Sequence, residues 1–227
     1  MTDSTKLRTP IADTAFWQAY ARLRYAILFY ALLLTLVAMP IAATAGLPTV
    51  LIKLLLGVCL VTAIMPSASK RNRQVFFISI VLLIAVRLAS DSRQIPVNPG
   101  LVLAVIGVIG LVAAAAALRY ALTAEKVDSE TLYAALSTYL LAGLFFGQIY
   151  WALEGFWEGS LVGPDPLTET RAAYYSFVTL ATLGYGDFVP RNDIARGAAV
   201  LEVIGGQLFL AVMIARLIGA FEAKRGD

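Results

Sequence analysis

The sequence predicts an all-α membrane protein with six membrane-spanning helices and a short re-entrant helix between the fifth and the sixth. Of its 227 residues, 59% are hydrophobic and only 15% are charged, which is far more apolar than a soluble domain. Six apolar runs are present, and most are long enough to cross a bilayer as a helix. About 40 residues separate the last two runs, too many for a plain hairpin loop, so part of that stretch must fold back.

The order of the runs also predicts the orientation of the chain. The six runs are 25–45, 48–66, 75–90, 100–121, 130–153 and 194–221. An even number of crossings places both termini on one side of the membrane. The alternate ends of the runs on that side carry 11 of the 18 Lys and Arg residues. The positive-inside rule therefore predicts a multi-pass protein of the plasma membrane with both termini in the cytoplasm.

Composition excludes several classes of function. The net charge is only +3 and no basic run is present, so nucleic-acid binding is not expected. Cys59 is the only cysteine, which rules out a disulfide within the chain. Histidine is absent, which removes the commonest general base and the commonest transition-metal ligand. Carboxylates and backbone oxygens remain as the available chemistry, and no cofactor is expected.

Four segments follow from these runs. They are an N-terminal cytoplasmic or interfacial segment 1–24, a four-helix membrane domain 25–122, a second membrane domain 129–222 and a short cytoplasmic tail 223–227. Residues 11–24 mix aromatic and basic side chains, so they form either a helix at the membrane interface or a plain extension of the first span. The alanine row 113–117 predicts a small-residue face on the fourth helix, where a neighbouring helix can approach closely.

The stretch between the last two runs contains the predicted re-entrant helix. Residues 170–181 form a short apolar segment, preceded by Thr168 and with Thr170 at its start, either of which can cap the helix beside Glu169. At about 18 Å such a helix is too short to cross the membrane. Glycine-rich backbone follows it, and irregular backbone at membrane depth is tolerated only where it lines a water-filled path or is buried in protein.

That backbone, Thr179-Leu180-Ala181-Thr182-Leu183-Gly184-Tyr185-Gly186-Asp187, contains a motif with a clear physical purpose. A pore that removes water from a cation must present closely spaced carbonyl oxygens toward its axis. Successive carbonyls can face the same way only if alternate residues adopt dihedrals that L-residues avoid, and Gly184 and Gly186 permit this. The segment resembles the selectivity filter of pore-loop potassium channels, whose pattern is Thr-Val-Gly-Tyr-Gly followed by aspartate.

The resemblance, which covers about residues 129–222, implies roles for named residues. Potassium ions, as permeant ligand, would bind along Thr182, Leu183, Gly184, Tyr185 and Gly186 of the filter, with Asp187 at its mouth. Tyr174, Tyr175 and Thr179 would support it, with the two tyrosines forming an aromatic collar against which Tyr185 braces the loop. With one loop per chain, closing a ring requires a homotetramer embedded in membrane lipid.

Leu183 departs from the family pattern, which has valine or isoleucine there. The carbonyl is unaffected, so potassium selectivity is expected to survive while the packing behind the filter loses a β-branched side chain. In the last helix, Gly205 and Gly206 match the gating hinge of the family. The alternative is that they allow close packing against the fifth helix, where Gly143 and Gly147 form a small-residue pair.

Glu202 lies at membrane depth, where a carboxylate is costly and is a functional hypothesis by default. One interpretation is a structural hydrogen bond to Ser176 or Thr179 behind the filter. The other is a pH-sensitive brace whose protonation changes the filter or the gate.

Two further features concern the mouth of the pore and gating. Acidic residues around the loop would form either a negative vestibule, repeated fourfold, or ordinary solvated loop charge. These residues are Glu154, Glu158, Asp165, Glu169, Asp187 and Asp193. The four-helix domain lacks a ladder of basic residues, since residues 101–118 of the fourth helix contain none and Arg119 stands at its end. We therefore expect no voltage gating.

Three other functions share features with this sequence. Gly184 to Asp187 also satisfies the Gly-x-Gly-Asp pattern of intramembrane aspartyl proteases, but that chemistry needs a second aspartate inside a helix, and Asp91 and Asp128 fall at helix ends. A potassium uptake transporter would carry four filter-like loops in one chain. A nonselective cation channel is disfavoured by the intact Gly-Tyr-Gly. The sequence thus predicts passive potassium conduction rather than an enzyme.

Overall fold

Residues 11–46, 99–124 and 127–225 are described by the computed structural model. This part of the chain contains five helices and two short strands. They are α1 (Ile11–Thr44), α4 (Pro99–Thr123), α5 (Ser129–Phe156), β1 (Leu161–Val162), α6 (Glu169–Leu180), β2 (Val189–Pro190) and α7 (Asp193–Arg225). The predicted runs 48–66 and 75–90 lie outside the described residues.

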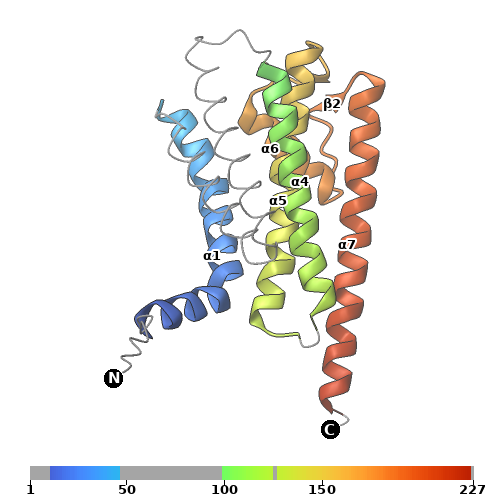
Figure 1. Cartoon of the computed structure of the whole chain (residues 1–227). Helices are drawn as coiled ribbons and strands as arrows, with labels where there is room; N and C mark the ends of the chain where they lie inside the picture. The colour runs from blue at the N-terminus through green and yellow to red at the C-terminus, as the bar shows by residue number, and fades with distance from the viewer. Residues whose placement is uncertain (1–10, 47–98, 125–126, 226–227) are drawn as a thin grey trace, which may run out of the picture.

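Four of these helices are long and apolar enough to cross a membrane, which makes the chain a multi-pass membrane protein. The candidate spans are Leu23–Thr44, Gly100–Thr123, Ser129–Phe156 and Asp193–Ala220. They coincide with the first, fourth, fifth and sixth predicted runs. The four helices run alongside one another, whereas α6 and both strands gather at one end of the bundle (Figure 1). The first turns of α1, the end of α4 and the end of α7 all lie toward the opposite end (Figure 1).

The first turns of α1 continue directly into the first span. Residues 11–24 are helical, and in Figure 1 these turns lie across the axis of the rest of α1. The segment therefore extends the span without a break, as one of the two interpretations predicts, and its position at a membrane interface stays a prediction.

The main apolar core lies between α1, α4 and α5, and small residues bring the helices together. Ala113, Ala114 and Ala117 of α4 are buried in it, as are Leu28 and Leu32 of α1. The predicted small-residue face on the fourth helix is thus confirmed. Short side chains allow α4 and α5 to pack along most of their length.

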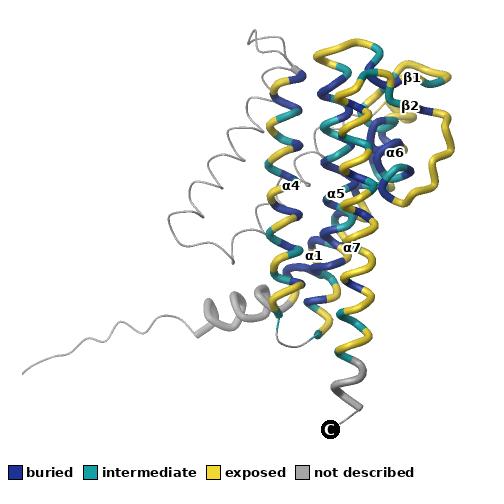
Figure 2. The backbone as a smooth tube through the Cα atoms, turned by 90° about the vertical axis from the view of Figure 1, so that its right-hand side faces the viewer, coloured by how far each residue is buried: buried dark blue, intermediate teal, exposed yellow. Residues whose placement is uncertain are grey.

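Figure 2 shows that α7 differs from the other spans, because most of it is exposed in the single chain. Its buried positions form one narrow stripe that includes Ala195, Glu202, Gly206 and Met213. The remaining surface of the helix carries large apolar side chains, including Leu201 at 65% exposure. A helix with one protein-facing stripe and apolar surface elsewhere is suited to lipid or to further protein contacts.

Candidate functional site

The short helix α6 is defined by caps at both ends. Thr168 is its N-cap and accepts a hydrogen bond from the amide of Arg171, which confirms the predicted start of the helix to within one residue. At the other end, the amide of Thr182 donates to the carbonyl of Thr179 at 2.9 Å. The amide of Leu183 donates to the carbonyl of Val178, also at 2.9 Å. These two bonds form a Schellman motif, with Thr182 in the left-handed conformation where glycine is usual.

Left-handed backbone then recurs at every second residue of the predicted filter. The φ angles are 57° at Thr182, 55° at Gly184 and 76° at Gly186. The two glycines adopt the dihedrals for which the sequence argument required them. The left-handed conformation of Thr182 was not predicted, because a β-branched residue is the least expected type in this conformation. The alternation read backward from Gly186 through Gly184 would have located it.

Within the same segment several backbone amides are hydrogen bonded, whereas the backbone carbonyls are not. The amides of Thr182, Leu183 and Gly184 turn back onto carbonyls of α6, the last at 3.4 Å from Val178. Among the described residues, no hydrogen bond is donated to the carbonyl oxygens of Thr182 through Gly186. The segment therefore presents free backbone oxygens, which suits it chemically to coordinate a cation without fixed charge.

The predicted aromatic support is only partly assembled in one chain. Tyr175 is buried and meets Tyr150 edge to face, with ring centroids 4.8 Å apart. Tyr174 is exposed, and its interaction with the carboxylate of Asp187 raises the pKa of the tyrosine hydroxyl. Tyr185 is 66% exposed and has no ring contact with either tyrosine within the described part of the chain. The bracing of Tyr185 against an aromatic collar of Tyr174 and Tyr175 is not seen within one chain and stays a prediction.

Glu202 lies behind the filter and joins three helices. Its side chain is fully buried, and Ser176 of α6 hydrogen bonds to it, as one sequence interpretation predicted. The Tyr150 hydroxyl of α5 donates to the other carboxyl oxygen at 2.8 Å. Thr179, the alternative predicted partner, is not bonded to it. Tyr150 was missed, since nothing in the local pattern links two residues 52 positions apart.

Gly143 and Gly147 of α5 and Gly206 of α7 pack on α6. A Cβ on Gly147 would lie 2.7 Å from the Cα of Ala173, and one on Gly143 would collide with the ring of Phe177. The predicted close packing of Gly143 and Gly147 against the last helix is therefore wrong, because the helix that contacts them is α6. A Cβ on Gly206 would lie 2.8 Å from the carbonyl oxygen of Leu180, whereas one on Gly205 would meet nothing within 4 Å. The helix α7 continues unbroken through both glycines.

The strands β1 and β2 and the hydrogen bonds beside them, called the clasp below, join the segment before α6 to the segment after the filter. β1 and β2 pair antiparallel, with Val162 opposite Val189. Beside them, the amide of Arg191 donates to the carbonyl of Ser160 at 2.9 Å. The Asn192 amide donates to the Ser160 hydroxyl at 2.8 Å and accepts from the amide of Ala195, so it caps α7 as well. The loop before α6 is thus joined to the loop after the filter.

Most of the predicted vestibule acids have local partners. Asp165 pairs with Arg171 at 2.8 Å, and Asp193 pairs with Arg196 at 3.3 Å. Glu154 accepts from the amide of Gly159 at 2.8 Å, and Glu169 accepts from Gln148 at 2.8 Å. These contacts favour loop architecture over a free negative vestibule for the four acids that make them.

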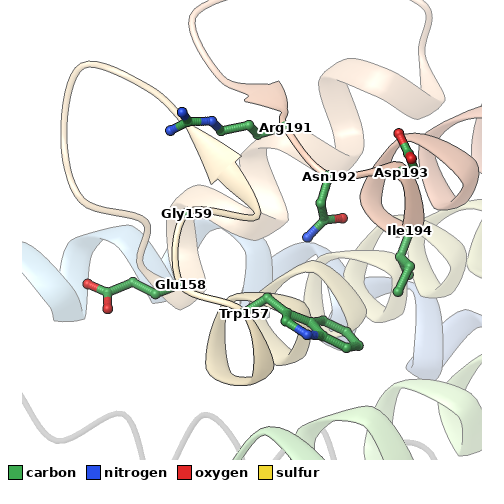
Figure 3. Close-up of a pocket in the computed structure, with 7 residues that line it drawn as sticks. All are labelled: Trp157, Glu158, Gly159, Arg191, Asn192, Asp193 and Ile194. Atoms are coloured by element: carbon green, nitrogen blue, oxygen red, sulfur yellow. The ribbon is translucent and has the colours of Figure 1, made fainter.

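An open pocket of about 470 Å³ lies between the end of α5 and the start of α7. Figure 3 shows Asn192 and Ile194 pointing toward the ring of Trp157, while Glu158 and Arg191 point away from it. The Asn192 amide is already bonded to Ser160 and Ala195. The pocket contains none of the predicted filter residues and is not the ion site.

Asp128, one of the aspartates weighed for protease chemistry, has a structural role. It is the N-cap of α5, and its carboxylate accepts from the amide and the hydroxyl of Thr131, each at 2.8 Å. These hydrogen bonds, the backbone bond first, lower the pKa of Asp128. Asp128 is bonded to Thr131, whereas the carboxylate of Asp187 interacts with Tyr174, and no contact joins the two carboxylates among the described residues. Asp91 lies outside the described residues.

Comparisons with known proteins agree with this geometry. Residues 136–223 match a protein family described as "Ion channel". Over 78 residues the chain is 32% identical to a Bacillus subtilis (strain 168) protein named "Putative potassium channel protein YugO". That match covers 34% of this chain and 21% of the relative, so the chain spans about a fifth of that protein. No solved structure matches. Over residues 136–223 the chain is therefore similar to ion channels, and the relative that it matches over 78 residues is named as a potassium channel.

Proposed function

We propose that the protein is a potassium-selective channel that conducts passively through a pore formed by four copies of the chain. The observation that carries the proposal is the row of free carbonyl oxygens from Thr182 to Gly186, on backbone that alternates into the left-handed region. Four such rows around an axis would give stacked rings of oxygens, the arrangement that replaces the hydration shell of a potassium ion. The name of the relative supports potassium as the ion.

The position of α6 supports cation binding at the same place. Its carboxyl end carries the partial negative charge of the helix dipole and leads directly into Thr182. Four such ends directed at one axis would stabilise a cation that has lost part of its water. Asp187 at the outer end of the filter adds a negative charge where cations would enter or leave.

The exposed residues support the tetramer. Leu183 is 56% exposed and Tyr185 is 66% exposed in the single chain, which leaves the filter unsupported on one side. A neighbouring copy that covers these side chains and part of the apolar surface of α7 would supply that support, and cyclic symmetry would repeat it. The mass of the purified complex in detergent tests this point, and a monomer or dimer that conducts would contradict it.

Orientation and gating follow from the four-helix domain. We place both termini in the cytoplasm of a cell with a plasma membrane of the bacterial type. The first turns of α1 and the ends of α4 and α7 share one end of the bundle, and among the described residues Arg24, Arg119 and Arg216 belong to these parts of the helices. The only basic residue of α4 is Arg119, near its end, so the described part of the domain offers no ladder of gating charges.

Reconstitution in a planar bilayer, with potassium and sodium on opposite sides, tests the function directly. We expect a reversal potential close to the potassium equilibrium potential and a conductance that changes little with voltage. Near-equal permeability would favour the second candidate, a nonselective cation channel, for which the specific observation is leucine at position 183. Leu183→Val serves as the matched variant, since it restores the family residue without altering the backbone carbonyl.

A further inference from the structure

Where α5, α6 and α7 meet, three buried oxygen–oxygen contacts share only two hydroxyl protons, those of Tyr150 and Ser176. Glu202 contacts two hydroxyl groups, that of Tyr150 at 2.8 Å and that of Ser176. The Ser176 oxygen lies in addition 2.6 Å from the carbonyl oxygen of Gly143. Glu202 and Ser176 are both fully buried. Three oxygen–oxygen contacts are therefore present away from water.

Each of these contacts requires one proton between its two oxygens. The carbonyl of Gly143 can only accept, so the single hydroxyl proton of Ser176 must be donated to it. The hydroxyl proton of Tyr150 occupies its contact with Glu202. The remaining contact, between Ser176 and Glu202, then has no proton unless the carboxyl group carries one. An ionised Glu202 would leave two buried acceptors facing each other, which is a costly arrangement.

We propose that Glu202 is a neutral carboxylic acid that donates its proton to Ser176. The order of donation is from Glu202 to Ser176 and from Ser176 to the backbone of α5 at Gly143, while Tyr150 donates to the second oxygen of Glu202. All four groups are then satisfied. The acid joins α7 to α6 and α5 through a single chain of hydrogen bonds.

The charges around the group agree with this assignment. The titratable side chains that face Glu202 are Tyr139 and Tyr150 from α5 and Tyr175 from α6. Within the described part of the chain no arginine or lysine pairs with it. A lone carboxylate in this position would lack both water and a counter-ion, and such groups take up a proton instead.

The place of this hydrogen-bonded network next to the filter makes Glu202 a positioning residue. Ser176 lies two residues before Val178, whose carbonyl receives the amides of Leu183 and Gly184. By holding α6 at Ser176, Glu202 fixes the helix end from which the filter backbone begins. The protonation follows from the contacts alone, whereas an effect on conduction rests on the proposed function.

Infrared difference spectroscopy of the reconstituted full chain, with Glu202→Gln as reference, tests the protonation. We expect a carboxylic-acid carbonyl band at neutral pH in the wild type that is lost in Glu202→Gln and shifts in deuterium oxide. Ser176→Ala should move the band, because the acid loses its acceptor. Glu158→Gln, which alters an exposed acid, should leave it unchanged. Absence of the band at neutral pH, or a band insensitive to Ser176→Ala, would overturn the assignment.

Potassium currents from the same preparations test the positioning role. In Glu202→Gln the amide nitrogen can still donate to Ser176 and the amide oxygen can still accept from Tyr150, so current at neutral pH should stay close to wild type. The wild type should lose current at alkaline pH, when the acid gives up its proton, and Glu202→Gln should not. Equal alkaline loss in both would refute the role. If the band is present but no potassium current flows, the protonation stands and the proposed function fails.

Discussion

The guanidinium group of Arg216 on α7 donates hydrogen bonds to the carbonyl oxygens of Leu122 and Ala124 at the end of α4. The two residues that it joins to α7 lie at the C-terminal end of α4 and just after it, more than 90 positions earlier in the chain. The last carbonyls of a helix have no partner within the helix and carry partial negative charge, so a cation is favoured there. The contact is a direct physical link between the end of α4 and the C-terminal half of α7.

Arg216→Gln should therefore destabilise the protein. Removing a charged donor from two carbonyls typically costs about 1 to 3 kcal/mol, whereas Arg216→Lys keeps the charge but loses the paired geometry and should cost less. Thermal unfolding in detergent would rank the three proteins. If the glutamine variant were as stable as wild type, the link would be energetically silent.

Substitutions of Gly205 and Gly206 in α7 can distinguish a gating hinge from a packing contact. Alanine at either position stiffens the helix to a similar extent, by roughly 1 kcal/mol of helix propensity. Only Gly206 lies against α6, at the carbonyl of Leu180. If packing dominates, Gly206→Ala should lower stability and potassium current while Gly205→Ala leaves both near wild type. Gly197→Ala is a suitable control, since its Cβ would meet nothing within 4 Å in the same helix. Equal changes in gating for the two variants would instead support a hinge.

Gly184→Ala tests the backbone of the filter. A Cβ at this position meets nothing within 4 Å in the single chain, so the substitution acts through the φ of 55°. A left-handed L-residue costs about 1 to 2 kcal/mol, and four copies would add up in a tetramer. We expect loss of potassium selectivity while the monomer fold, followed by circular dichroism, is retained. Unchanged selectivity would mean that the left-handed turn at Gly184 is not needed.

The cap at Asp128 gives a pH dependence whose sign can be stated. Because hydrogen bonds from Thr131 lower the pKa of Asp128 in the folded state, the ionised cap stabilises the protein fully above the pKa of the unfolded chain. That stabilisation is lost as the pH falls through the lower folded value. Asp128→Ala should cost about 1 kcal/mol at neutral pH, and the difference from wild type should shrink in acid. Urea unfolding of the two proteins at neutral and acidic pH would show this, and a difference independent of pH would contradict it.

The sequence was a good guide where function is written in local backbone chemistry. Thr168 as a cap and Gly184 and Gly186 as left-handed positions follow from residue type and spacing. The bond from Ser176 to Glu202 was also accessible, because a buried carboxylate needs a donor and few are at membrane depth.

Contacts that depend on how the helices are arranged were not accessible in the same way. Gly143 and Gly147 predict a close approach of helices but do not say which helix approaches, and the neighbour is α6 rather than α7. Tyr150 and Arg216 reach partners far away in the chain, and no periodicity encodes such a pairing. Tyr185 makes no ring contact within the single chain, and in the proposed tetramer its surroundings would come from other copies.

The pairing of β1 with β2 has a thermodynamic consequence for the filter. Pairing residue 162 with residue 189 makes α6 and the filter a closed loop. The conformational entropy of closing that loop is therefore lost when the two strands pair, and the filter residues do not have to offset it. In a chain whose single cysteine excludes an internal disulfide, this ladder serves as a non-covalent staple. The segment should consequently open and close as one cooperative unit, so that its amides exchange with solvent together.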